Sequence, residues 1–343
     1  MKKYHSIFIR VLVIAIGFAL ITTACASKPT LPIYPKDPPL ATLELSALVT
    51  PHLPRSTETL TLPTTADTVT LTVTPTVTAT PEPSLRFAII GDYGISGQPE
   101  ADVAALIESW DVELIITTGD NNYPFGAAET IDQNIGQYFH QFIYPYQGNY
   151  GEGADRNRFF PTLGNHDWSY VNAKPYLEYF SLPGNERYYD FIWQPVHFFA
   201  LDSDSREPDG VGRSSDQAQW LQDKLRDSNA VWKVVYMHHT PFSSAKHGPT
   251  NWAQWPYKQW GASIVIAGHD HVYERLTIDD FPYITNGLGG GHIYGFSEPF
   301  PGSEIRYQAN HGAMLVEATN QSISFQFITV HGDIIDSYTL SPK

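Results

Sequence analysis

The chain has 343 residues, of which 42% are hydrophobic and 17% are charged, so it is long enough for one large globular domain or two smaller ones. Its 36 acidic and 21 basic residues give a formal net charge of −15. That charge argues against non-specific nucleic-acid binding, which needs clustered Lys and Arg. The single cysteine, Cys25, excludes an intrachain disulfide and a CxxC site.

The first 25 residues have the layout of an export signal. Basic residues precede an apolar run over residues 11–21, and small residues then lead to Cys25. The run is shorter than the roughly 20 residues of a membrane-spanning helix, so we expect a signal peptide over residues 1–25. An uncleaved anchor is the alternative.

The stretch "TTAC" before the end of this signal resembles the cleavage zone of bacterial lipoproteins, although Thr22 stands where that family usually has Leu. In that family the cysteine is lipid-modified and becomes the mature N-terminus. The resemblance implies an exported protein at the cell surface or in the periplasm, anchored to the membrane through Cys25. The alternative is an incidental cysteine in an ordinary secretion signal.

Residues 26–84 are rich in Thr and Pro. Proline removes amide donors and favours extended backbone, and such a segment buries too little apolar area to offset the entropy of ordering. We therefore expect a disordered linker over residues 26–84, with a short strand in "TVTLTVTPTVT" as the alternative.

The remaining residues, 85–343, are predicted to form one α/β domain. Apolar runs predict buried strands in "LRFAII", "VELIITT", "RFFPTL", "VHFFALD", "VWKVVYM" and "GASIVIAG". Helical patterns lie between them in "PEADVAALIESW", "TIDQNIGQYFHQFI" and "SSDQAQWLQDKLRDS". Ser214 or Ser215 is expected to cap the third helix. Three strands follow in the tail and predict an antiparallel meander. This order fits two packed mixed β-sheets flanked by helices, a four-layer α-β-β-α sandwich.

Polar residues gather where the predicted strands end. These residues are Asp92, Asp120, Asn165, His166, Asp167, His238, His239, His269, Asp270 and His271. Sites in open α/β sheets form beyond the carboxyl ends of strands, and Asp, Asn and His are oxygen and imidazole ligands for transition metals. Each residue alone fits an ordinary turn or cap; five such strand ends together predict a metal site.

The ordered motifs "GDYG", "GDNNY", "GNHD", "VYMH" and "GHDH" resemble the metallophosphoesterases, also called calcineurin-like phosphoesterases. Within them the match is to the purple acid phosphatases, including the tartrate-resistant acid phosphatases. Most metallophosphoesterases have Asp-x-His in the first motif, but Gly94 stands in place of that His. In the purple type a tyrosine fills the gap, and Tyr123 has that position here.

The resemblance implies two metal ions. Site 1 would be formed by Asp92, Asp120, Tyr123 and His271. Site 2 would be formed by Asp120, Asn165, His269 and one histidine of the "HH" pair, for which we choose His238 over His239. The expected ions are Fe(III) in the tyrosinate site and Fe(II), Zn or Mn in the second. If "GHDH" is extended, His269 and His271 project to the same side.

The function that the resemblance implies is hydrolysis of phosphate monoesters outside the cytoplasm by a metal-bound hydroxide, as in acid phosphatases. His166 and His247 hold the positions that protonate the leaving group in the family. A small phosphate ester is the expected partner, with no nucleic-acid binding. The alternatives are a phosphodiesterase or nucleotide hydrolase on the same scaffold, and a non-catalytic metal-binding module displayed at the surface.

Weaker signals have ordinary explanations. "GLGGGH" at residues 287–292 is read as a tight turn and not as a phosphate loop. Asp202 and Asp204 follow a strand, and loop capping is the favoured interpretation. The aromatic residues over 252–260 either line a substrate cleft or cover core.

Overall fold

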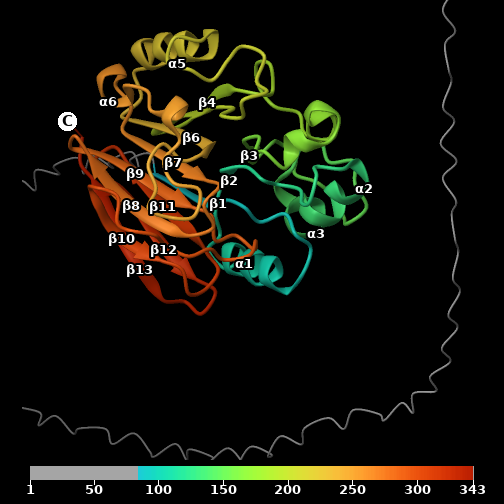
Figure 1. Ribbon diagram of the computed structural model, residues 1–343. Helices are drawn as coiled ribbons and strands as arrows, with labels where there is room; N and C mark the ends of the chain where they lie inside the picture. The colour runs from blue at the N-terminus through green and yellow to red at the C-terminus, as the bar shows by residue number, and fades with distance from the viewer. Residues whose placement is uncertain (1–83, 343) are drawn as a thin grey trace, which may run out of the picture. The chain divides into compact units, whose positions relative to one another are not determined.

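The computed structural model describes residues 84–342 (Figure 1). The expected signal peptide over residues 1–25 and all of the expected linker except Ser84 lie outside the described residues. Within 84–342, none of the helices combines the length and apolar character needed to cross a membrane.

The first sheet has six strands in the order β13-β12-β11-β1-β2-β3. Its strands are β1 (Ser84–Ile90), β2 (Leu114–Thr117), β3 (Phe159–Pro161), β11 (Gly312–Thr319), β12 (Ile323–Thr329) and β13 (Ile334–Leu340). β1, β2 and β3 are parallel, whereas β1, β11, β12 and β13 pair antiparallel. The meander predicted for the tail is therefore confirmed, and it adds the antiparallel half of a mixed sheet.

The second sheet has seven strands in the order β10-β8-β9-β7-β6-β5-β4. These are β4 (Tyr189–Trp193), β5 (Val196–Ala200), β6 (Trp232–His239), β7 (Ile264–Gly268), β8 (Tyr273–Ile278), β9 (Phe281–Asn286) and β10 (Ser303–Tyr307). β5, β6, β7 and β9 are parallel, and the other pairings are antiparallel. The parallel strands are buried on both faces, as their continuous apolar runs predict.

Three buried clusters define the layers. The largest lies between the sheets and joins residues such as Phe87 and Val316 of the first to Phe198 and Ile266 of the second. The outer face of the first sheet is covered by α1 (Gln98–Glu108), α2 (Ala128–Ile131), α3 (Gln137–Phe139) and α4 (Lys174–Tyr179). The outer face of the second is covered by α5 (Asp216–Asp227) and α6 (Tyr257–Trp260). The predicted four-layer α-β-β-α sandwich is confirmed.

Ser215 is the residue that caps α5, because its Oγ accepts a hydrogen bond from the Ala218 amide at 3.1 Å. This is the N-terminal cap that a hydroxyl side chain provides. The sequence left Ser214 and Ser215 open, and the structure selects Ser215.

The segment 130–143, predicted as one helix, is interrupted. A five-residue π-helical turn at Asp132–Gly136 separates α2 from α3. The turn brings Asn134 to the loop after β2, where its Nδ2 donates to Asn122 Oδ1 at 2.9 Å and to the Tyr123 carbonyl at 3.0 Å. Such turns recur at functional sites, and this one holds the loop that carries Tyr123.

Glu100 in the first turn of α1 is fully buried, and neither carboxylate oxygen has a hydrogen-bond partner among the described residues. It packs on the 289–291 loop, since a Cβ added to Gly290 would lie 3.2 Å from Glu100 Cβ. Burial raises the pKa of Glu100 well above its usual range, and the nearby Ile95 backbone offsets this only in part.

We predict that Glu100→Gln stabilises the fold at neutral pH. Because the folded pKa lies above the unfolded one, the wild type loses stability as pH rises from the unfolded to the folded pKa, by about 1.4 kcal/mol for each pH unit between them. The amide has no charge to bury and removes this loss. Thermal unfolding at several pH values checks it, with exposed Glu108→Gln on the same helix as control. A pH profile identical to that of the wild type would contradict the prediction.

Candidate metal centre

Three of the predicted ligands lie where strands of the two sheets end. Asp92 follows β1, Asp120 follows β2 and His269 follows β7. All three have left-handed backbone, with φ of 56°, 54° and 70°. Such conformations are costly for non-glycine residues and cluster at functional sites. The chain thus turns sharply at each strand end and brings these side chains inward.

Four donor groups, one of them the hydroxyl of Tyr123, gather on one side of this cluster. Tyr123 Oη lies 3.1 Å from Asp120 Oδ2, 3.1 Å from His271 Nε2 and 3.4 Å from Asp92 Oδ1. His271 Nε2 lies 3.3 Å from Asp92 Oδ1. The four residues that the sequence assigns to site 1 therefore converge.

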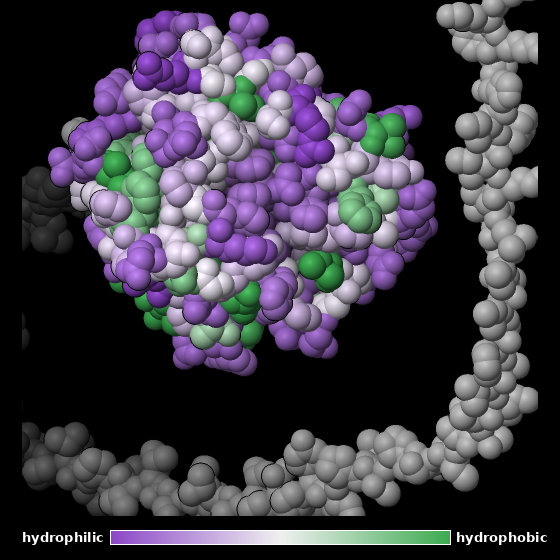
Figure 2. Space-filling view, viewed as in Figure 1, coloured by the Kyte–Doolittle hydropathy of each residue, from purple (hydrophilic) through white to green (hydrophobic). Residues whose placement is uncertain are grey.

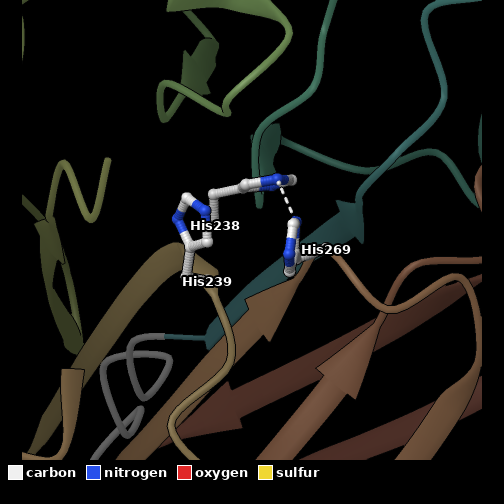
Figure 3. A group of neighbouring side chains, drawn as sticks. All are labelled: His238, His239 and His269. Atoms are coloured by element: carbon white, nitrogen blue, oxygen red, sulfur yellow. Dashed lines mark hydrogen bonds between the residues drawn. The ribbon is translucent and has the colours of Figure 1, made fainter. Parts of the chain in front are cut away.

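A second group of donors surrounds His238. Its Nε2 lies 3.0 Å from Asn165 Oδ1, 3.1 Å from His269 Nδ1 and 3.4 Å from Asp120 Oδ2. In Figure 3 the rings of His238 and His269 lie next to each other, joined by this contact. Asp120 Oδ2 reaches both groups, as a carboxylate shared by two metal ions must.

The choice between the two adjacent histidines depends on their other partners. His239 Nδ1 lies 3.0 Å from Ser203 Oγ, and its ring packs 4.4 Å from that of His269 (Figure 3). His239 is close enough to count with His238 and His269 as a potential ligand group. Only His238 contacts Asn165 and Asp120, however, so the geometry favours His238.

Backbone carbonyls orient the imidazoles of His238 and His271, whose Nε2 atoms face the donor cluster. His238 Nδ1 donates to the Thr118 carbonyl at 2.8 Å, and His271 Nδ1 donates to the His292 carbonyl at 2.7 Å. Because a carbonyl only accepts, each Nδ1 carries a proton, and Nε2 is the nitrogen that faces the cluster and would bind a metal ion. The "GLGGGH" turn supplies one of these carbonyls, a role that its sequence did not indicate.

The buried carboxylates give the cluster a negative charge that bound cations would neutralise. Burial opposes a charged His238, but Asp120 and Asp92 outweigh it and raise the pKa of His238 to about 10. Burial together with the same two carboxylates raises the pKa of Tyr123 well above its usual range. Two metal ions would neutralise this negative charge, and carboxylate, phenolate, amide and imidazole donors suit hard and borderline metals. The donor set therefore fits a metal pair.

Asp167 of "GNHD" supports the cluster from behind. Its carboxylate accepts hydrogen bonds from the Gly164 amide at 2.8 Å and from the Asn121 side chain at 2.8 Å. Burial and nearby Asp120 raise the pKa of Asp167 to about 7. Asp167 thereby ties the loop of Asn165 to the loop of Asp120.

One expectation about "GHDH" is wrong. The segment 269–272 is a bend and not an extended strand, because His269 has positive φ. The geometry of a strand therefore does not place these side chains; the turn directs His269 toward His238 and His271 toward Tyr123, so both still reach neighbouring donor groups. Asp270 bonds elsewhere, accepting from Ser243 Oγ at 2.6 Å.

The two predicted proton donors flank the donor groups. His166 Nδ1 donates to the Pro124 carbonyl at 2.5 Å, and its Nε2 lies 3.9 Å from Asp120 Oδ2. The ring of His247 packs 4.2 Å from that of His269. Both residues reach solvent, so they lie beside the cluster where a substrate would enter.

Other side chains near the cluster divide between structural and surface roles. Trp252 is 45% exposed and packs near His239, whereas Trp255 and Tyr257 are core. The core interpretation is therefore confirmed for Trp255 and Tyr257, and a substrate cleft lined by Trp252 stays a prediction. Tyr294, which sequence reasoning missed, stacks on His271 at 4.1 Å with an interplanar angle of 6°.

The family is shown by comparison with known proteins. The model of the calcineurin-like phosphoesterase family matches residues 85–273, more than half of the chain. The chain therefore belongs to the calcineurin-like phosphoesterases, a family of metal-dependent hydrolases with two-metal sites.

Within the calcineurin-like phosphoesterases, the chain is similar to the purple acid phosphatases. Purple acid phosphatase 17 of Arabidopsis thaliana is 26% identical over 301 residues, which cover 76% of this chain and 85% of the relative. Tartrate-resistant acid phosphatase type 5 of Mus musculus is 23% identical over 267 residues, covering 66% and 76%. The predicted resemblance is confirmed.

Solved structures support the fold. The purple acid phosphatase PPD1 of yellow lupin aligns with a TM-score of 0.61 at 17% identity, covering 76% of this chain and 54% of that one. The Plasmodium protein GAP50, described as the anchor in the inner membrane complex, aligns with a TM-score of 0.58 at 20% identity, covering 76% and 89%.

We predict that iron-loaded wild-type protein absorbs visible light and that Tyr123→Phe abolishes this band, because only a phenolate bound to Fe(III) provides the charge transfer. Absorption spectra with iron content measured in parallel check this. Tyr294→Phe is the matched control, since it removes a neighbouring hydroxyl without removing a predicted ligand. Colourless iron-loaded wild type, or colour retained in Tyr123→Phe, would contradict the ligand assignment.

Proposed function

We propose that the chain is an exported acid phosphatase that hydrolyses phosphate monoesters. The observation that carries the proposal is the sharing of Asp120 between two donor groups, with His166 and His247 beside them. Site 1 would hold Fe(III) and site 2 would hold Fe(II), Zn or Mn. When bound, such a pair supplies an activated water and neutralises phosphate oxygens.

The residues of this chain divide the remaining work. Asp120 fixes the spacing of the two donor groups, because it touches Tyr123 on one side and His238 on the other. The Pro124 carbonyl orients His166 and leaves its Nε2 to hold the proton that the leaving oxygen needs. His247 lies against His269 and is the second group placed to deliver a proton.

A second function is favoured by one observation, the likeness in fold to a protein described as an anchor in a membrane complex. This chain would then be a surface-displayed metal-binding module without turnover. The presence of His166 and of all seven predicted ligands supports the enzyme instead. A phosphodiesterase or nucleotide hydrolase is the remaining alternative on the same site.

We predict that purified protein with bound metal hydrolyses 4-nitrophenyl phosphate faster than bis(4-nitrophenyl) phosphate. His166→Ala is expected to lower kcat on the monoester by about 10²- to 10⁴-fold, the contribution of a general acid, with metal content unchanged. Exposed His331→Ala serves as control. Faster diester cleavage would indicate the phosphodiesterase, and no turnover of either ester with both metals bound would indicate the binding module.

We also propose that Cys25 anchors the protein outside the cytoplasm. The support is its position directly after the apolar run and small residues of the signal. Because a single acyl chain binds membranes only weakly, stable anchoring through the lipid-modified Cys25 requires more than one acyl chain.

Cys25→Ser is accordingly expected to move the phosphatase from the membrane fraction to the soluble fraction of cells. Immunoblots of the two fractions measure this distribution, and incorporation of a lipid label measures the modification. Membrane association that persists in the variant would favour an uncleaved anchor.

A further inference from the structure

A loop that the predicted machinery does not use lies against site 2. It follows β5 and covers residues 201–207. Ser203 Oγ bonds His239, and Arg206 Nη2 donates to the backbone carbonyl of Asn165 at 3.0 Å. Asn165 is a predicted ligand, so Arg206 places a guanidinium directly beside the metal centre.

The guanidinium is held rigidly by one carboxylate. Arg206 Nε donates to Asp204 Oδ1 at 2.6 Å, and its Nη2 donates to Asp204 Oδ2 at 2.7 Å. The Asp204 side chain is 4% exposed whereas that of Arg206 is 41% exposed. The contact therefore buries the carboxylate and leaves the cation partly open to solvent.

One nitrogen of the Arg206 guanidinium remains available. Within residues 84–342, Arg206 Nη1 makes no hydrogen bond, while Nε and Nη2 are fully used. A guanidinium has five N–H groups in a rigid plane, so the two on Nη1 are free. Because both N–H groups of Nη2 are used, Nη1 offers charge-assisted hydrogen bonds to phosphate oxygens through one nitrogen and not through a two-nitrogen fork.

The loop that carries Arg206 is itself held by hydrogen bonds and an ion pair. Asp202 accepts a hydrogen bond from Trp168 Nε1 at 2.8 Å, and its amide donates to the Gln217 side chain at 2.9 Å. Glu207, buried at the other end of the loop, pairs with Arg187 at 2.9 Å. Arg206 is therefore held at a set place relative to Asn165.

We infer that Arg206 is a specificity-determining residue that binds a second phosphate group of the substrate, beyond the one that is cleaved. The inference rests on the proposed phosphatase function and deepens it. In a protein of net charge −15, the guanidinium of Arg206 contacts the backbone of a predicted ligand through Nη2, and its open N–H groups on Nη1 give a second anionic group a partner. The preferred substrates are compounds with two linked phosphates.

The reaction on such a substrate balances simply. Water adds to the phosphorus held at the metal centre, and the bond from that phosphorus to the bridging oxygen breaks. The bridging oxygen leaves with the second phosphate, which Arg206 holds, and takes up a proton. Inorganic pyrophosphate thus gives two phosphates, and ADP gives AMP and phosphate.

The test compares three substrates in wild type and Arg206→Gln: phenyl phosphate, inorganic pyrophosphate and ADP. We expect kcat/KM to fall by about 10- to 100-fold on pyrophosphate, on ADP or on both, the effect of one lost charge-assisted contact, and by less than about twofold on phenyl phosphate. Loss on both identifies the diphosphate itself as the ligand, and loss on ADP alone identifies a nucleotide.

Controls separate this role from a structural one. Arg226→Gln on α5 removes an exposed arginine that is also paired with aspartates and should change nothing. Arg206→Lys keeps the charge but loses the planar group that bonds Asp204 and Asn165 together, and should recover only part of the loss. An equal loss on all three substrates, or no loss on any, would overturn the inference. Wild type that fails to cleave even phenyl phosphate would instead refute the proposed phosphatase.

Discussion

The structure depends on one shared carboxylate. Asp120 lies between a group of donors around Tyr123 and another around His238, and its Oδ2 is within 3.4 Å of both. Burying it beside Asp92 is unfavourable unless positive charge lies between them. Contacts such as those of Asp167 with the loops of Asp120 and Asn165 keep these groups together in spite of that repulsion.

Close backbone packing makes the arrangement attainable. Gly119 has φ of 87°, and a Cβ there would lie 2.9 Å from the His238 ring, so the loop after β2 meets the end of β6 only because this residue has no side chain. The strand ends of the two sheets thus meet at the site while their inner faces share one core. On the face shown in Figure 2, hydrophobic residues of the described part of the chain lie singly or in small groups among hydrophilic ones.

The sequence predicted most of the fold and of the donor cluster because short motifs at the strand ends indicate both. An apolar run followed by Gly-Asp or Gly-Asn marks both a buried strand and the turn that exposes a ligand, so the layers and the convergence of Asp92, Asp120 and Asn165 followed from pattern alone. The edge strands β4 and β10 were not predicted, since half-exposed strands lack a strong apolar run, and the largely buried strands β8 and β9 were not predicted either. Whether the converged residues bind metal stays a prediction.

Long-range contacts account for what the sequence did not predict. The carbonyl of His292, the stacking of Tyr294 and the contact of Arg206 with Asn165 join residues that no periodicity relates. The π-helical turn also accompanies a long-range contact, because it lets Asn134 hydrogen-bond to Asn122 and Tyr123 in the loop after β2. The positive φ of His269 likewise accompanies packing against Asp92, which accepts its amide hydrogen bond at 2.9 Å. Tertiary contacts override local preference at such points.

The most direct measurement is the metal stoichiometry of purified protein and of Asp120→Asn. If one carboxylate joins two ions, the wild type contains two metal ions per chain and the variant loses both together. Loss of a single ion in the variant, or a wild type that never binds more than one, would contradict the shared centre.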